Sequence, residues 1–166
     1  MSDDGASNNE LLLAACKNDQ DDMVSDIFKE GSYDINFRDG AGNTAAHYAA
    51  KHGSLDCLEL LVGHDGIDLD AKNTLEGDTP LHKAVEFSDD PDVAIAMVEI
   101  LLEAEADPRI KNRNQLTPIQ LVNPNNEEMK ELLESAVVSY QVGDDDVVDE
   151  DDYGSADEDE IPSDEE

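Results

Sequence analysis

The chain has 166 residues, enough for one domain of ordinary size and a tail but not for a second full domain. Its 43 acidic and 10 basic residues give a formal net charge of −33, which disfavours direct binding to nucleic acid or anionic membranes and favours basic partners. No apolar run approaches the roughly 18 residues of a membrane helix, so we expect no membrane association.

The cysteines and the first residues bear on where the protein acts. Cys16 and Cys57 lie in apolar surroundings without CxxC spacing, which is typical of reduced, buried thiols rather than a disulfide framework or a zinc site. The opening Met-Ser-Asp-Asp-Gly lacks the features of a signal peptide. We therefore expect a cytoplasmic protein. The sequence contains no basic import signal, so it does not predict whether the protein also enters the nucleus.

Acidic residues accumulate toward the C-terminus. No Lys or Arg follows Lys130, and residues 131–166 contain 16 of the 43 acidic side chains. From about Asp144 the composition is acidic with Gly, Ser and Pro, and it cannot bury enough apolar surface to offset the entropy lost on ordering. We predict a disordered acidic tail over residues 137–166 and a flexible N-terminus over residues 1–7.

Between these ends, apolar residues recur at helical spacing and are separated by Gly, Asp and Asn. They form four pairs of segments in chain order: 11–15 with 23–28, 42–47 with 56–62, 77–84 with 97–102, and 116–119 with 129–133. Each pair predicts a helix-turn-helix unit, so the fold class is all-α. The four units span approximately residues 8–38, 39–73, 74–112 and 113–136.

Three of these units share a threonine motif. Gly-Asn-Thr-Ala-Ala-His at 42–47 aligns with Gly-Asp-Thr-Pro-Leu-His at 77–82, which places Thr44 and Thr79 35 residues apart, and Leu-Thr-Pro-Ile at 116–119 lies 38 residues further on. With Lys83 and Ala84 following, the third unit resembles the ankyrin repeat, whose signature is T-P-L-H-x-A. The resemblance implies an ankyrin-repeat solenoid over residues 8–136 that functions in protein binding rather than as an enzyme.

The units also differ from one another. The first lacks the threonine motif and the last has Gln120 in place of the histidine, as expected for terminal repeats that face solvent on one side. In the third unit 18 residues separate Thr79 from Met97, against 13 between Thr44 and Cys57. We expect Pro91 to begin a longer second helix there.

The resemblance implies a scaffold role for His47 and His82, whose rings would hydrogen-bond locally and to the neighbouring repeat. No GxSxG, SxxK, HExxH or Cys-His arrangement suggests a catalytic base. His47 and His52 are five residues apart, on different faces of a helix, so they do not predict a metal site. We expect no catalytic residues, no cofactor and no metal.

Candidate partner-binding residues lie at the variable positions of the first helices and at the tips of the loops. They are Phe37, Arg38, Tyr48, Lys51, His52, Leu75, Glu76, Lys83, Glu86, Phe87, Arg113 and Asn114. Tyr48 and Phe87 are the most distinctive, because aromatic side chains often anchor interfaces. The alternative that they only cover the neighbouring helix stays open.

The leading hypothesis is an interaction protein, expected to be a monomer, that binds one basic protein client. The combination of repeats and acidic tail is similar to small fungal ankyrin-repeat proteins that escort a ribosomal protein, which implies a dedicated chaperone. The alternative is a regulatory adaptor or inhibitor of an enzyme or transcription factor. Ser155 and Ser163 precede acidic residues and resemble casein kinase II acceptor sites, so both are candidate phosphorylation sites.

Overall fold

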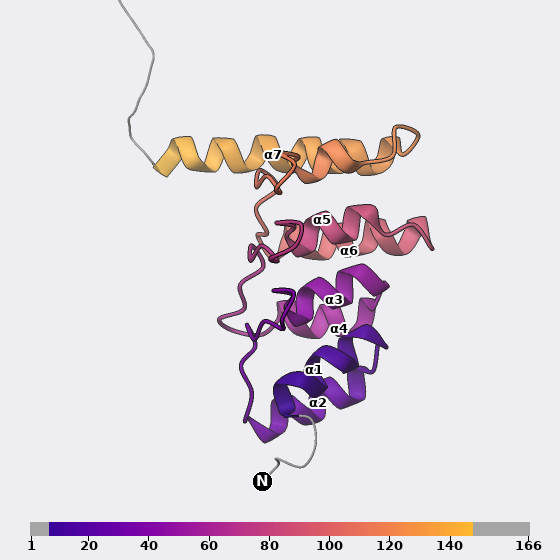
Figure 1. Cartoon of the computed structure of the whole chain (residues 1–166). Helices are drawn as coiled ribbons and strands as arrows, with labels where there is room; N and C mark the ends of the chain where they lie inside the picture. Colours follow the sequence, from indigo (N-terminus) through magenta and orange to yellow (C-terminus); the bar gives the residue numbers. More distant parts are fainter. Residues whose placement is uncertain (1–6, 148–166) are drawn as a thin grey trace, which may run out of the picture.

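A computed structural model describes residues 7–147, and it also describes their side chains through Gln141. Helices lie in pairs, and the pairs are stacked one above the next, with the loops between the pairs along one side (Figure 1). The elements are α1 (Asn8–Lys17), α2 (Asp21–Glu30), α3 (Ala45–His52), α4 (Leu55–Val62), α5 (Pro80–Glu86), α6 (Pro91–Glu103), the 3-10 helix η2 (Pro118–Leu121) and α7 (Glu127–Val147). No strand occurs among the described residues, which confirms the predicted all-α class.

Short-range signals determine where the first helix of each unit begins. Thr44 and Thr79 lie just before α3 and α5, and the side chain of each accepts a hydrogen bond from the backbone N–H three residues later. This satisfies one of the four N–H groups that have no partner at a helix start. Ser7 caps α1 in the same way, together with Glu10.

Small side chains in the first helices and larger ones in the second helices form the core. In α3 the buried alanines Ala45, Ala46, Ala49 and Ala50 let the helix pack closely between α1 and α5. In the second helices, α4 and α6 pack against each other through leucine, methionine and valine side chains. Cys16 and Cys57 are fully buried free thiols, as predicted.

The third unit contains the longer second helix that its sequence predicts. Asp90 caps the N-terminus of α6 through its side chain, Pro91 occupies the first turn, and α6 has 13 residues against 8 in α4. Proline is favoured at this position because its missing N–H would have no helical partner there.

The fourth unit differs from the predicted helix-turn-helix form. Its first helix is only a four-residue 3-10 turn, η2, although Thr117 and Gln120 still form a capping box. Pro124 follows closely and cannot continue a helix, because it lacks a backbone N–H and its ring clashes with the preceding turn. The unit therefore consists of a short turn and the long helix α7.

The boundary of the predicted tail at residue 137 also needs correction. Residues 137–147 continue α7 rather than starting a disordered segment. Tyr140 explains part of this extension, since its hydroxyl donates to the carbonyl oxygen of Glu105 at 3.2 Å and its ring lies 4.6 Å from the Arg109 guanidinium. Residues 148–166, with the remainder of the predicted tail and both candidate phosphorylation sites, lie outside the described residues.

Among residues 7–147, no helix is long and apolar enough to span a membrane. The same residues contain no cluster of His, Cys, Asp and Glu side chains that could hold a metal ion.

Candidate interaction surface

The two motif histidines connect neighbouring units. The Thr44 N–H donates to Nδ1 of His47 at 3.1 Å, which makes Nδ1 an acceptor and places the ring proton on Nε2. That nitrogen donates to the carbonyl oxygen of Asp78, in the next unit, at 2.8 Å. His82 repeats the arrangement with Thr79 and donates to the carbonyl oxygen of Leu116 at 2.9 Å. The hydrogen bonds confirm the scaffold role predicted for both histidines.

Burial keeps both rings neutral. His47 and His82 are 1% and 0% exposed, and this desolvation lowers the pKa of each imidazole despite the hydrogen bond that each makes to a carbonyl. A neutral ring with one fixed tautomer can donate and accept at the same time, as both positions require. Neither histidine is available as a catalytic base.

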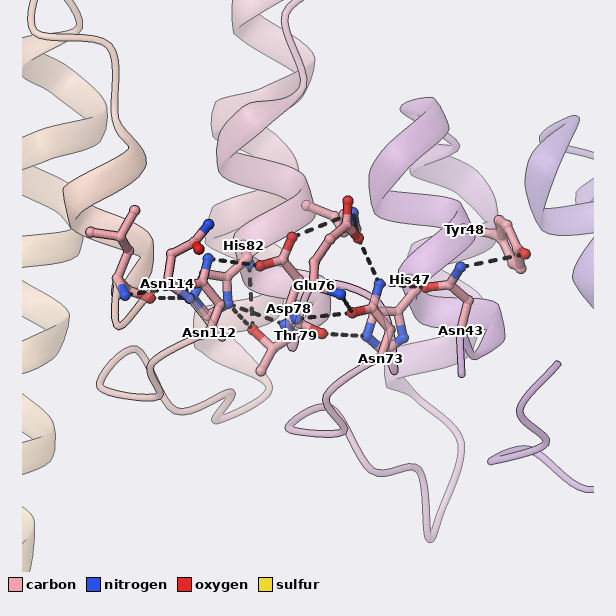
Figure 2. Close-up of polar contacts among 12 residues, drawn as sticks. Asn43, His47, Tyr48, Asn73, Glu76, Asp78, Thr79, His82, Asn112 and Asn114 are labelled. Atoms are coloured by element: carbon pink, nitrogen blue, oxygen red, sulfur yellow. Dashed lines mark hydrogen bonds and ion pairs between the residues drawn. The ribbon is translucent and has the colours of Figure 1, made fainter. Parts of the chain in front are cut away.

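A chain of polar side chains joins the loops in front of the first helices (Figure 2). The Asn73 amide donates to the side-chain oxygens of Asn43 and Glu76, both at 2.9 Å. One unit further, the Asn112 amide donates to a carboxylate oxygen of Asp78 at 3.0 Å. These contacts hold successive loops in a fixed register, so the loop tips form one continuous edge of the stack.

Lys83 lies inside this chain rather than on the surface. Its ammonium is 2.6 Å from Glu76 and 3.4 Å from Asp78, with only a tenth of the side chain exposed. Burial disfavours the charged ammonium, but the two carboxylates outweigh this effect and raise the pKa of Lys83. The hydrogen bond from Lys83 lowers the pKa of Glu76 in turn. Lys83 and Glu76 therefore form a structural ion pair in addition to any contact they make with a partner.

Tyr48 contacts charged and aromatic groups from the loop before α3, from α1 and from α3 itself. Its hydroxyl donates to the carboxylate of Asp39, and the Lys17 ammonium lies 4.5 Å from the centre of its ring. His52 stacks on the same ring at a centroid distance of 6.3 Å, and Lys51 is exposed beside it. The structure thus brings three of the predicted residues, Tyr48, Lys51 and His52, into one small area.

Phe87 packs against the end of α3. Gly53, which terminates that helix with φ of +70°, leaves the space that the Phe87 ring fills, because a Cβ there would lie 2.4 Å from Phe87 Cζ. The ring is half-buried. This contact favours, for Phe87, the alternative that the aromatic ring covers a neighbouring helix.

Apart from Tyr48, Lys51, His52 and Lys83, the predicted residues fall into two separated groups. Phe37, Arg38, Leu75, Glu76, Arg113 and Asn114 precede the first helices and lie along the loop edge, whereas Glu86 and Phe87 lie at the opposite end of α5. Leu75 is 71% exposed, the most exposed large hydrophobic side chain among the described residues. One compact partner would contact one of these groups more readily than both.

Acidic residues are concentrated on the second helices and not on the first ones, a pattern that the sequence analysis missed. Together α1, α3 and α5 contain three lysines and two glutamates. Through Gln141, where the described side chains end, the second helices α2, α4, α6 and α7 contain 13 acidic residues and only two basic ones, Lys29 and Lys130. Counting charges helix by helix would have found it. The outer face formed by the second helices is therefore strongly acidic.

Comparison with known proteins gives a consistent family assignment. The family described as ankyrin repeats, in three copies, matches residues 11–112. An ankyrin repeat-containing protein of Saccharomyces cerevisiae is 35% identical over 144 residues, which cover 81% of this chain and 78% of the yeast protein.

Other relatives are similar over the repeats alone. The nuclear factor NF-kappa-B p105 subunit of chicken is 33% identical over 120 residues, which cover 71% of this chain and 12% of that protein. The NF-kappa-B inhibitor cactus of Drosophila melanogaster is 42% identical over 53 residues, which cover 32% of this chain and 10% of that protein. The chain thus spans most of the yeast relative but only about a tenth of these two larger ones.

Proposed function

The chain belongs to the ankyrin-repeat family, and we propose that its repeats bind a basic protein client and escort it as a dedicated chaperone. Ankyrin repeats are protein-interaction modules, because stacking provides an extended surface whose variable positions are not needed for packing. The single observation that carries the finer proposal is the distribution of charge: through Gln141, the second helices have 13 acidic residues against two basic ones.

This distribution suits a basic client in two ways. An acidic face attracts Lys- and Arg-rich surfaces over distances of about a Debye length and raises the rate of encounter. It also competes with nucleic acid for the same client surface, which protects a newly made RNA-binding protein from premature or non-specific contacts. A ribosomal protein is a client of this kind.

The same charge argues for a monomer, since two copies at −33 each repel one another. We propose that the protein acts in the cytoplasm, where such a client is synthesised, and that it enters the nucleus together with the client.

Affinity capture with the full chain from its own cells tests the proposal. At about 0.05 M salt, where electrostatic attraction is little screened, mass spectrometry should identify one basic protein in stoichiometric amount. Purified client should then precipitate with RNA when alone and stay soluble when the chain is added first. Capture of only acidic or neutral proteins would contradict the proposal.

The alternative function is a regulatory adaptor or inhibitor of an enzyme or transcription factor. The similarity to the NF-kappa-B inhibitor cactus favours it, although that similarity covers only 32% of the chain. The same capture experiment separates the two functions: an adaptor would recover an enzyme subunit or a transcription factor instead of a newly made RNA-binding protein.

A further inference from the structure

The outer face contains a groove between α6 and α7. It has a volume of about 840 Å³, is open to solvent, and has Leu102, Ala106, Leu132 and Ala136 among its lining residues. These side chains come from the end of the third unit and from the fourth unit. The groove therefore lies between two second helices, on the acidic side of the stack.

The side chains of α7 explain why this space is not filled. Ser135, Ala136 and Ser139 lie on the α7 surface that lines the groove, at the three- and four-residue spacing of one helix face, and all are small. Between α4 and α6, by contrast, Leu58, Leu61 and other large side chains are fully buried. Leu102 and Leu132 stay only half-buried as a result.

One end of the groove is held in place by Tyr140. Its hydroxyl donates to the carbonyl oxygen of Glu105, and its ring lies against the guanidinium of Arg109. Arg109 in turn is bound to the carboxylate of Asp107 at 2.9 Å. A chain of contacts thus connects α7 to the loop after α6, so that this end of the groove is formed before any partner binds.

The charged residues that line the groove are all acidic. Glu99, Glu103 and Glu105 contribute to its lining, all three are exposed, and no lysine or arginine is among the lining residues. An apolar floor with carboxylates along its rim matches an amphipathic segment that presents apolar side chains flanked by Lys or Arg.

We propose that this groove binds an amphipathic basic segment of the client, whose apolar side chains enter between α6 and α7 while its Lys or Arg residues pair with Glu99, Glu103 and Glu105. This inference rests on the proposed function and assigns it a surface. Two other occupants are disfavoured by charge. The C-terminal residues of this chain are acidic from Asp149 to Asp152, and a second copy would bring another acidic outer face. The negative charges of Glu99, Glu103 and Glu105 would repel either occupant.

A titration with designed peptides tests the groove directly. The probe is a fluorescent 18-residue helical peptide, with leucines along one face and lysines elsewhere, added to the full chain. A second peptide replaces every lysine by glutamate, and a third replaces every leucine by serine. Fluorescence anisotropy should show binding of the first peptide only, because the groove requires both an apolar face and positive charge.

Matched variants locate the site. The triple variant E99Q/E103Q/E105Q should weaken binding of the first peptide about tenfold and reduce its salt dependence, as expected when three exposed charge pairs are removed. The control D26N/D56N/E59Q removes the same charge from exposed positions on α2 and α4. It should change the affinity less than about twofold, because those positions do not line the groove.

A second pair of variants tests the apolar floor. Ser139→Leu places a larger side chain in the groove and should abolish peptide binding, whereas Gln141→Leu adds the same side chain at an exposed position of α7 that does not line the groove. Circular dichroism checks that both variants remain helical. Methyl signals of Leu102 and Leu132 should shift on peptide binding, independently of any substitution.

The outcomes separate this inference from the proposed function. If the full chain captures a basic client but the E99Q/E103Q/E105Q and Ser139→Leu variants capture it equally well, the groove assignment is overturned and the escort proposal stands. If the basic and acidic peptides bind equally, or if the peptide shifts signals of Tyr48 and Lys51 instead, the groove assignment also fails. Absence of any basic client in the capture experiment contradicts the proposed function itself.

Discussion

His47 and Asp78 are 31 residues apart in sequence, and a hydrogen bond of 2.8 Å from the buried imidazole to the Asp78 carbonyl joins them across two units. His82 makes the equivalent contact with Leu116. Each histidine thus caps its own helix and holds the loop of the next unit. Repeat proteins gain much of their stability from such contacts between neighbours.

Replacing either histidine by alanine should destabilise the fold without altering the interaction surface. We expect His47→Ala and His82→Ala each to lower the free energy of unfolding by about 1 to 2 kcal/mol, because buried hydrogen-bonding partners lose their donor. Urea unfolding followed by circular dichroism measures the change. Glutamine should restore part of the loss, since Gln120 accepts from the Thr117 N–H at 2.8 Å in the fourth unit. The exposed His52→Ala is the control. A loss of client binding at unchanged stability would contradict the scaffold role.

Stability should also fall on mild acidification because of these two residues. Burial lowers the pKa of His47 and His82 in the folded state. The unfolded chain therefore binds protons first as the pH drops below about 6.5, and protonation favours unfolding. Above that pH the neutral rings of His47 and His82 contribute their full stabilisation. This stabilisation is lost as the pH falls toward the lowered pKa values that the two histidines have in the folded state.

Urea titrations at pH 7 and pH 5 measure this effect. The double variant His47→Gln and His82→Gln should lose less stability between the two pH values than the natural chain does. Equal losses of stability in the two proteins would show that the histidines do not determine the acid sensitivity. The sensitivity would then be assigned to carboxylates such as Glu76, whose pKa is lowered by its hydrogen bond with Lys83.

Gly53 and Phe87 should be energetically coupled. Gly53→Ala combines a left-handed φ of +70° with a Cβ that would lie 2.4 Å from the Phe87 ring, so we expect a loss of about 2 kcal/mol. In a Phe87→Ala background the clash disappears and only the backbone strain of about 1 kcal/mol remains. A double-mutant cycle by urea unfolding measures the difference. Additive effects would show that the ring does not pack on Gly53.

Removing residues 148–166 should slow the capture of a basic client while leaving α7 complete. This segment contains 11 acidic residues and no Lys or Arg, so we expect its deletion to remove long-range electrostatic attraction. Stopped-flow association rates for the full and truncated chains, at low and physiological salt, test this expectation. Tyr48→Ala should instead increase mainly the dissociation rate, if the client contacts the first helices. Equal association rates and equal salt slopes would leave the segment without a role in capture.

Features that depend on short-range spacing can be predicted from the amino-acid sequence. The threonine and histidine three residues apart predict where α3 and α5 begin, because the side chain and the backbone N–H groups that it caps are local neighbours. The repeat period predicts the stack of four units. The apolar surroundings of Cys16 and Cys57 predict their burial, which the structure confirms.

Features that depend on contacts between side chains of distant segments become visible in the folded chain and not in its sequence. The contact of the Phe87 ring with Gly53 and the contacts of Tyr140 with Glu105 and Arg109 are of this kind. The first favours the alternative that the Phe87 ring covers a neighbouring helix, and the second accompanies the continuation of α7 through residues 137–147. The groove between α6 and α7 belongs to the same class. Its volume depends on how far the side chains of two distant segments, residues 99–106 and 132–140, fill the space between two helices, and spacing along the chain does not record that packing.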